Sequence, residues 1–145
     1  VSEHNDLSSV VLKDGTQLDA DFFIDCSGFE SLLMQKALKG EFVSYKDSLM
    51  NDAAVVMPTV ISENIPVETK STALSSGWAW QIPLRDRFGN GYVYSRDYID
   101  DEQAEVELRQ HLGLLDSHIE ARHLTMKVGR VEKHWHQNCL AVGLS

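Results

Sequence analysis

The sequence Gly77-Trp78-Ala79-Trp80-Gln81-Ile82-Pro83 places two tryptophans two residues apart. On an extended segment, residues i and i+2 project from the same face, so both indoles are predicted to lie side by side on one face of a strand. The proline then ends the strand, because it donates no backbone hydrogen bond to a neighbour. Paired aromatic side chains can simply fill a core, so this stretch alone leaves structural and functional roles open.

The residues around this stretch predict an antiparallel sheet followed by one helix. Strands are expected over 53–58, 73–82 and 91–95, with Gly89-Asn90-Gly91 forming a hairpin between the last two. Asp100-Asp101 and Gly113 bound a helix with one apolar side. The residues predicted on that core-facing side are Ala104, Leu108, His111 and Leu112.

The beginning of the chain predicts a hairpin and then a buried strand. Asp14-Gly15 is a strong turn signal between strands expected over 8–12 and 17–21. The uninterrupted apolar run Phe22-Phe23-Ile24 is typical of a strand buried on both faces. Such strands occur in α/β folds, where helices cover both faces of a sheet.

The segment Asp25-Cys26-Ser27-Gly28 joins this strand to a predicted amphipathic helix that ends at Gly40. Ser27 and Glu30 have the spacing of a capping box. In open α/β sheets, ligands bind beside the carboxyl ends of strands. Glycine there lets the backbone approach a phosphate or ribose, and the free amides of a helix N-terminus favour an anion. An ordinary strand–helix turn explains the same residues equally well.

The end of the chain predicts a return to α/β structure. A strand is expected over 124–130, and an apolar run over 138–144 closes on glycine. We therefore predict an α/β chain with an inserted, mainly antiparallel module, divided into 1–40, 41–135 and 136–145. Because the chain starts without Met inside a predicted strand and stops after an apolar run, we expect it to be an internal piece of a longer protein.

Composition excludes several classes of function. The chain has 145 residues, of which 43% are hydrophobic and 24% charged, as in globular domains. A formal net charge of -9 with scattered basic residues argues against a nucleic-acid partner. The longest uncharged stretch, 71–84, contains serine, glutamine and proline, so no membrane span is predicted. With no signal peptide and two widely spaced cysteines, we expect reduced thiols and a cytoplasmic location.

Two further patterns are weighed as chemistry. His134 and His136 lie two residues apart and could bind a metal, but no third ligand has suitable spacing, so no metal site is predicted. Cys26 lies near a predicted helix N-terminus, which can lower a thiol pKa. Because no base partner is identifiable, a small buried packing residue is the favoured interpretation of Cys26.

Together, three blocks of the sequence resemble the flavin-dependent tryptophan halogenases, whose signature is Trp-x-Trp-x-Ile-Pro. The first block runs from Ala20 to Phe29, and the second from Gly77 to Pro83 and on through Arg87 to Ser95. The third comprises Val128-Gly129-Arg130, Trp135, Asn138-Cys139 and Gly143-Leu144-Ser145. Their order and spacing span nearly the whole chain.

The resemblance implies a Rossmann-like FAD module split by a substrate module. In this family reduced FAD, dioxygen and chloride or bromide give hypohalous acid, which halogenates an electron-rich ring, here most closely that of tryptophan. Reduced flavin comes from a separate reductase, and a homodimer is left open. On this basis 1–40 and 136–145 belong to the FAD module, and 41–135 to the substrate module.

The resemblance also assigns expected roles to residues of this chain. Trp78 and Trp80 would lie near the tunnel between flavin and substrate and keep the two apart. Asp25, Ser27 and Gly28 would fall at the FAD-facing turn, and Gly143 with Leu144 would begin a second flavin contact. Glu30 departs from the family, which usually carries arginine there.

The family's glycine-rich FAD fingerprint and its catalytic lysine and glutamate fall outside residues 1–145. We therefore expect the 145-residue chain by itself neither to bind FAD stably nor to halogenate. Two alternatives stay open: a related FAD-dependent aromatic monooxygenase, and a flavin-binding relative without turnover. A barrier of paired tryptophans argues against hydroxylation, because that reaction needs the substrate beside the flavin.

Overall fold

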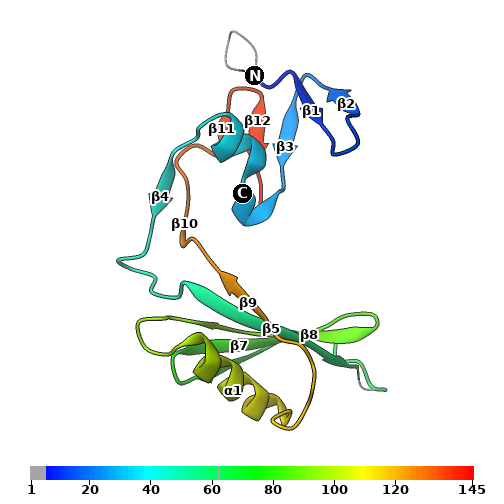
Figure 1. The fold of residues 1–145 in the computed structure, drawn as a ribbon, viewed down its shortest axis with the longest axis vertical. Helices are drawn as coiled ribbons and strands as arrows, with labels where there is room; N and C mark the ends of the chain where they lie inside the picture. Colours follow the sequence, from blue (N-terminus) through cyan, green and yellow to red (C-terminus); the bar gives the residue numbers. More distant parts are fainter. Residues whose placement is uncertain (1–5, 62) are drawn as a thin grey trace. The chain divides into compact units, whose positions relative to one another are not determined.

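The computed structural model describes residues 6–61 and 63–145 and contains two compact units (Figure 1). The first unit comprises Val1–Tyr45 with Gly129–Ser145, and the second comprises Lys46–Val128. These divisions lie a few residues from the predicted boundaries after 40 and after 135. The mixed α/β fold class with mostly antiparallel sheets is confirmed, whereas the assignment of the units to cofactor and substrate stays a prediction.

The second unit is a five-stranded antiparallel sheet with one helix, α1, packed on it (Figure 1). The strands are ordered β6-β7-β8-β5-β9. Their bounds are β5 Ala53–Val60, β6 Lys70–Leu74, β7 Gly77–Pro83, β8 Arg87–Tyr94 and β9 Arg122–Thr125. Side chains alternate between the two faces, so Ala79 of β7 packs beneath α1 with Tyr92 and Tyr94 of β8.

Three predicted features of this part of the chain are wrong. The strand expected over 73–82 is two strands, because Ser75-Ser76 forms the turn between β6 and β7. Gly89-Asn90-Gly91 is not a hairpin turn but lies inside β8, paired with β7. The turn comes earlier, where the Leu84 amide donates to the Arg87 carbonyl at 2.8 Å. The strand expected over 124–130 is likewise divided between β9 and β10 (Gly129–Val131).

Helix α1 (Asp101–Leu112) is confirmed with its predicted ends. The Asp100 carboxylate accepts from the Gln103 amide at 2.8 Å, and the Gln103 side chain completes a capping box. Gly113 ends the helix in the left-handed conformation, φ +70°. His111, predicted on the core face, is exposed instead. It lies in the last turn of the helix, where it lines an open hollow together with Lys70 of the edge strand β6.

The first unit contains three small pairings of strands. The predicted hairpin is confirmed as β1 (Ser9–Val11) and β2 (Gln17–Asp19), with Gly15 in the turn at φ +86°. β4 (Phe42–Ser44) pairs antiparallel with β10. β11 (Trp135–His136), β12 (Cys139–Ala141) and β3 (Phe23–Asp25) form a third sheet in which β12 and β3 are parallel.

In the described part of the chain, no helix is long and apolar enough to cross a bilayer.

The strand and helix predicted around residues 22–39 are only partly confirmed. β3 buries Phe23 and Asp25, but Ile24 is 57% exposed. In the described residues, the segment that contains Met34 and Leu38 packs with Phe23 on one face of this sheet. The continuous helix is a 3₁₀ turn η1 (Gly28–Glu30) followed by a π-helical turn η2 (Leu32–Ala37). Ser31 separates them at φ +40°.

The predicted capping box of Ser27 and Glu30 is therefore wrong. The Ser31 hydroxyl accepts from the Gln35 amide and caps η2. The Glu30 carboxylate pairs instead with the Lys36 ammonium. A left-handed residue between the two turns prevents the 27–30 spacing from acting within a single helix.

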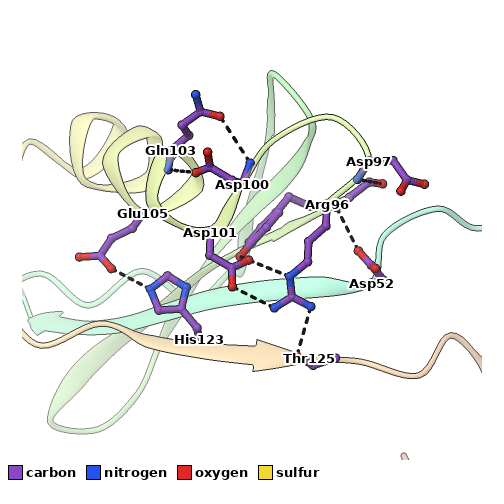
Figure 2. Close-up of polar contacts among 11 residues, drawn as sticks. Asp52, Arg96, Asp97, Asp100, Asp101, Gln103, Glu105, His123 and Thr125 are labelled. Carbon is purple, nitrogen blue, oxygen red and sulfur yellow. Dashed lines mark hydrogen bonds and ion pairs between the residues drawn. The ribbon is translucent and has the colours of Figure 1, made fainter.

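A polar network holds the first turn of α1 onto the sheet (Figure 2). The Arg96 guanidinium donates to both carboxylate oxygens of Asp101, at 2.8 and 3.0 Å, and to the Thr125 hydroxyl of β9 at 3.1 Å. The buried Tyr94 hydroxyl donates to the same carboxylate at 2.7 Å. These bonds, from the Arg96 side chain first and then Tyr94, lower the pKa of Asp101 to about 2. One turn farther along, Glu105 hydrogen-bonds the His123 ring at 2.8 Å.

We expect Asp101→Asn to lower the free energy of unfolding of the second unit by about 1–3 kcal/mol, because it leaves Arg96 unpaired and the Tyr94 hydroxyl poorly satisfied. The folded pKa lies below the unfolded value of about 3.9. The carboxylate therefore stabilises above about pH 4, and this contribution is lost as the pH falls toward about 2. Urea unfolding as a function of pH, with hydrogen exchange of α1 amides, measures both. The exposed neighbour Asp97→Asn is the control, and equal, pH-independent losses in the two variants would contradict the assignment.

Candidate functional site

Two parallel strands of the first unit end at the same edge of their sheet. β3 ends at Asp25 and β12 at Ala141, and the two pair in parallel register. The Val142 amide donates to the Asp25 carbonyl at 3.0 Å, and the Gly28 amide donates to the Ser145 hydroxyl at 3.0 Å. The segments after these strands therefore lie together at a carboxyl edge, which is where ligands bind in α/β sheets.

This edge contains all five residues expected at the cofactor. Asp25, Ser27 and Gly28 come from the segment after β3, whereas Gly143 and Leu144 come from the segment after β12. Ser145 joins the two segments through its bond to Gly28 but was not singled out from the sequence. The sequence offers one signal for Ser145: it is a small polar residue two positions after Gly143, which is predicted to contact the flavin.

The Asp25 carboxylate is fully used inside the fold. Oδ1 accepts from the Ser27 amide at 3.0 Å and from the Ser27 hydroxyl at 2.5 Å. Oδ2 accepts from the amides of Leu33 and Met34 at 2.9 and 2.8 Å. Burial alone would raise the pKa of Asp25, but these hydrogen bonds outweigh it and hold the pKa below its usual value. Asp25 thus ties the turn to η2 and does not present a free carboxylate.

The two glycines at this edge leave its surface open. Gly28 has φ +65° and Gly143 has φ +74°, and a Cβ added at either would have no heavy atom within 4 Å. Leu144 beside them is 63% exposed. Bare, left-handed backbone at the ends of parallel strands is the surface that lets a dinucleotide phosphate or ribose come close. The residues present therefore fit a nucleotide cofactor.

Cys26, Cys139 and the His134–His136 pair are the remaining residues with candidate chemistry. Cys26 is exposed, so its predicted packing role is wrong: it falls between Asp25, which points inward, and Ser27. Cys139 is the buried thiol, and burial first and then the nearby Asp25 raise its pKa.

Within the described residues, no three His, Cys, Asp or Glu side chains gather as metal ligands. His136 lies in β11 and is paired with Cys139, whereas His134 lies one residue before the strand begins.

Trp78 and Trp80 lie side by side on the face of the second unit's sheet opposite α1. Ala79 between them is buried in the core with Ala104 and Leu108 of the helix, so alternation turns both indoles outward. Their ring centroids are 5.9 Å apart with the planes inclined by 53°. This confirms that they share one face. Trp78 is 43% exposed, whereas Trp80 is partly covered.

The indole pair can shape a surface but cannot move a proton at neutral pH. Each ring has only two side-chain torsions, so the pair forms a rigid apolar wall at little entropic cost. An indole carries one N–H donor and no acid–base group. Whatever reaction takes place beside these rings must therefore draw its reactive groups from elsewhere in the protein.

Comparison with known proteins relates the whole chain to one family. Residues 1–145 match the family model described as tryptophan halogenase. The chain is 44% identical to the tryptophan 6-halogenase of Streptomyces toxytricini over 96% of its length, and 37% identical to the tryptophan 7-halogenase of Kutzneria over 100%. A solved tryptophan C-6 flavin-dependent halogenase from taromycin biosynthesis superposes with a TM-score of 0.88 at 44% identity, covering 99% of the chain.

The match extends over a minor part of each relative. The chain spans 27% of the Streptomyces protein, 28% of the Kutzneria protein and 28% of the taromycin halogenase. Within that part, the segments at the parallel-strand edge and the strand with the two tryptophans are both included.

Replacing Asp25 tests its role in this edge. We expect Asp25→Asn to lower the free energy of unfolding by about 3 kcal/mol, because an amide cannot accept all of the hydrogen bonds that meet the carboxylate. Since the folded pKa is depressed, the stabilisation is present above the unfolded pKa of about 3.9 and is lost as the pH falls below it. Urea unfolding and hydrogen exchange at Leu33 and Met34 report the change. Asp21→Asn, an exposed carboxylate before the same strand, is the control; unchanged exchange in Asp25→Asn would refute the role.

Proposed function

This chain belongs to the tryptophan halogenase family, and from that premise we propose that its protein catalyses FAD-dependent halogenation of an aromatic ring. Tryptophan is the proposed substrate, and reduced flavin, dioxygen and chloride or bromide are the other reactants. The observation that carries the proposal is the family match over residues 1–145, which includes the outward-facing indole pair. The proposal includes a separate reductase that supplies reduced flavin in the cytoplasm. A homodimer stays a prediction.

We propose that the FAD nucleotide lies on the edge where β3 and β12 end. Gly28 and Gly143 would let it approach the bare backbone, with Ser27 and Leu144 beside it. Asp25 would act through the turn, since both its oxygens are occupied by internal hydrogen bonds. When bound and reduced, the flavin would supply two of the four electrons that reduce dioxygen and the halide would supply the other two, giving oxidised flavin, hypohalous acid and water.

The proposed role of Trp78 and Trp80 is to separate the aromatic substrate from the flavin. Their rings lie next to each other on one face of the sheet, with centroids 5.9 Å apart, and large rigid side chains so placed would exclude both water and a second ring. Only a small species could then pass from the flavin to the substrate. This favours halogenation over direct hydroxylation, which requires contact between flavin and ring.

The full-length protein supplied with a flavin reductase, FAD, bromide and tryptophan tests the activity. Brominated tryptophan, identified by its isotope doublet in mass spectrometry, is the expected product. Hydroxylated tryptophan would instead identify a monooxygenase, and bound flavin with neither product would identify a binding protein. A chloride reaction and a series of indoles then define halide and substrate preference.

Substituting Gly28 tests the proposed cofactor surface. We expect Gly28→Val to weaken FAD binding about tenfold or more, because a branched side chain covers the surface where the backbone is bare. Gly15→Val is the matched control: Gly15 also has positive φ with open space around a Cβ, but it lies in the β1–β2 turn. Fluorescence titration of FAD measures affinity, and thermal unfolding checks that both variants bear a similar backbone penalty. Equal weakening by both variants would contradict a flavin contact at Gly28.

A further inference from the structure

The Trp80 indole lies directly over a glycine of the neighbouring strand. Trp80 of β7 and Gly91 of β8 are paired in register. A Cβ added to Gly91 would lie 2.2 Å from Cζ2 and 2.3 Å from Cη2 of the indole, far inside van der Waals contact. The six-membered part of the ring therefore occupies the space that any other residue at position 91 would need.

Backbone conformation does not account for this glycine. Gly91 is not among the residues with positive φ, so its extended backbone is accessible to any amino acid. It is buried in β8, the middle strand of five, where glycine weakens a strand because it packs no side chain and loses more entropy on folding. Space for the ring is the remaining reason for glycine at this position.

The neighbouring Gly89 provides a contrast on the same strand and the same face. It pairs with Ile82, and a Cβ added there would meet only Leu84 Cδ1 at 3.7 Å and the Ile82 carbonyl oxygen at 4.0 Å. These are ordinary contact distances. Alanine is therefore accommodated at position 89 but collides with an indole at position 91.

We propose that Gly91 is a positioning residue that seats the Trp80 ring and thereby fixes the wall formed with Trp78. The two indoles then differ in role: Trp80 is held against β8, whereas Trp78, opposite Val93, is presented with 43% of its surface exposed. In this arrangement the two rings are inclined by 53°. The catalytic meaning of the seat rests on the proposed barrier function.

The test compares Gly91→Ala with Gly89→Ala in the full-length protein. The first readout is the exciton couplet of the two indoles in circular dichroism, which depends on their mutual orientation and not on activity. The second is the amount of halogenated product per reduced flavin consumed. We expect Gly91→Ala to abolish or invert the couplet and to lower this yield between about tenfold and a hundredfold, as a misplacement of about 1 Å can do. Gly89→Ala should change neither.

A double-variant comparison keeps the proposal testable if Gly91→Ala folds poorly. In a Trp80→Ala background, where the ring is absent, adding Gly91→Ala should no longer lower the unfolding midpoint. An unchanged couplet in Gly91→Ala, or the same loss of stability with and without the Trp80 ring, overturns the seat. A changed couplet with an unchanged product yield overturns its link to the barrier and leaves the proposed halogenation itself intact.

Discussion

The alternation of side chains along β7 is the constraint on which the second unit depends. Ala79 is small and buried beneath α1 with Tyr92 and Tyr94, so the residues on either side of it must face the other way. A slip of one residue would place two indoles against the helix and one methyl group outside. The burial that stabilises the sheet therefore also decides that both tryptophans form an outer surface.

In the first unit, a single buried side chain stabilises the irregular segment that follows β3. Gly28 and Gly143 have left-handed backbone, and so does Ser31, which divides the segment into the short turns η1 and η2. The two oxygens of the buried Asp25 carboxylate accept four hydrogen bonds from that region. A charged group is stable there only because every lone-pair direction is used, so rigidity and charge are obtained together.

Local signals predicted the elements whose cause is local. The β1–β2 hairpin and α1 follow from a turn dipeptide and from caps, and both were correct to within a few residues. The hairpin prediction for Gly89-Asn90-Gly91 was wrong because these residues contact neighbouring strands. Gly91 leaves space for the Trp80 ring of β7, and the buried Asn90 side chain donates to the Met57 carbonyl of β5. A Gly-Asn-Gly sequence therefore indicates a turn only where its glycines are not required to make room for a side chain of a neighbouring strand.

The candidate site illustrates the same distinction at longer range. Residues near 25–28 and 143–145 come together because β3 and β12 pair in parallel, and neither segment alone contains a signal for that pairing. The resemblance to a family could group them because it carries the fold with it. What these residues themselves contribute is shape: bare backbone at one edge, and a pair of rigid indoles on another sheet. Under the proposed barrier function, specificity would rest on which molecules are kept apart, and a small displacement of one ring would matter more than a change of charge.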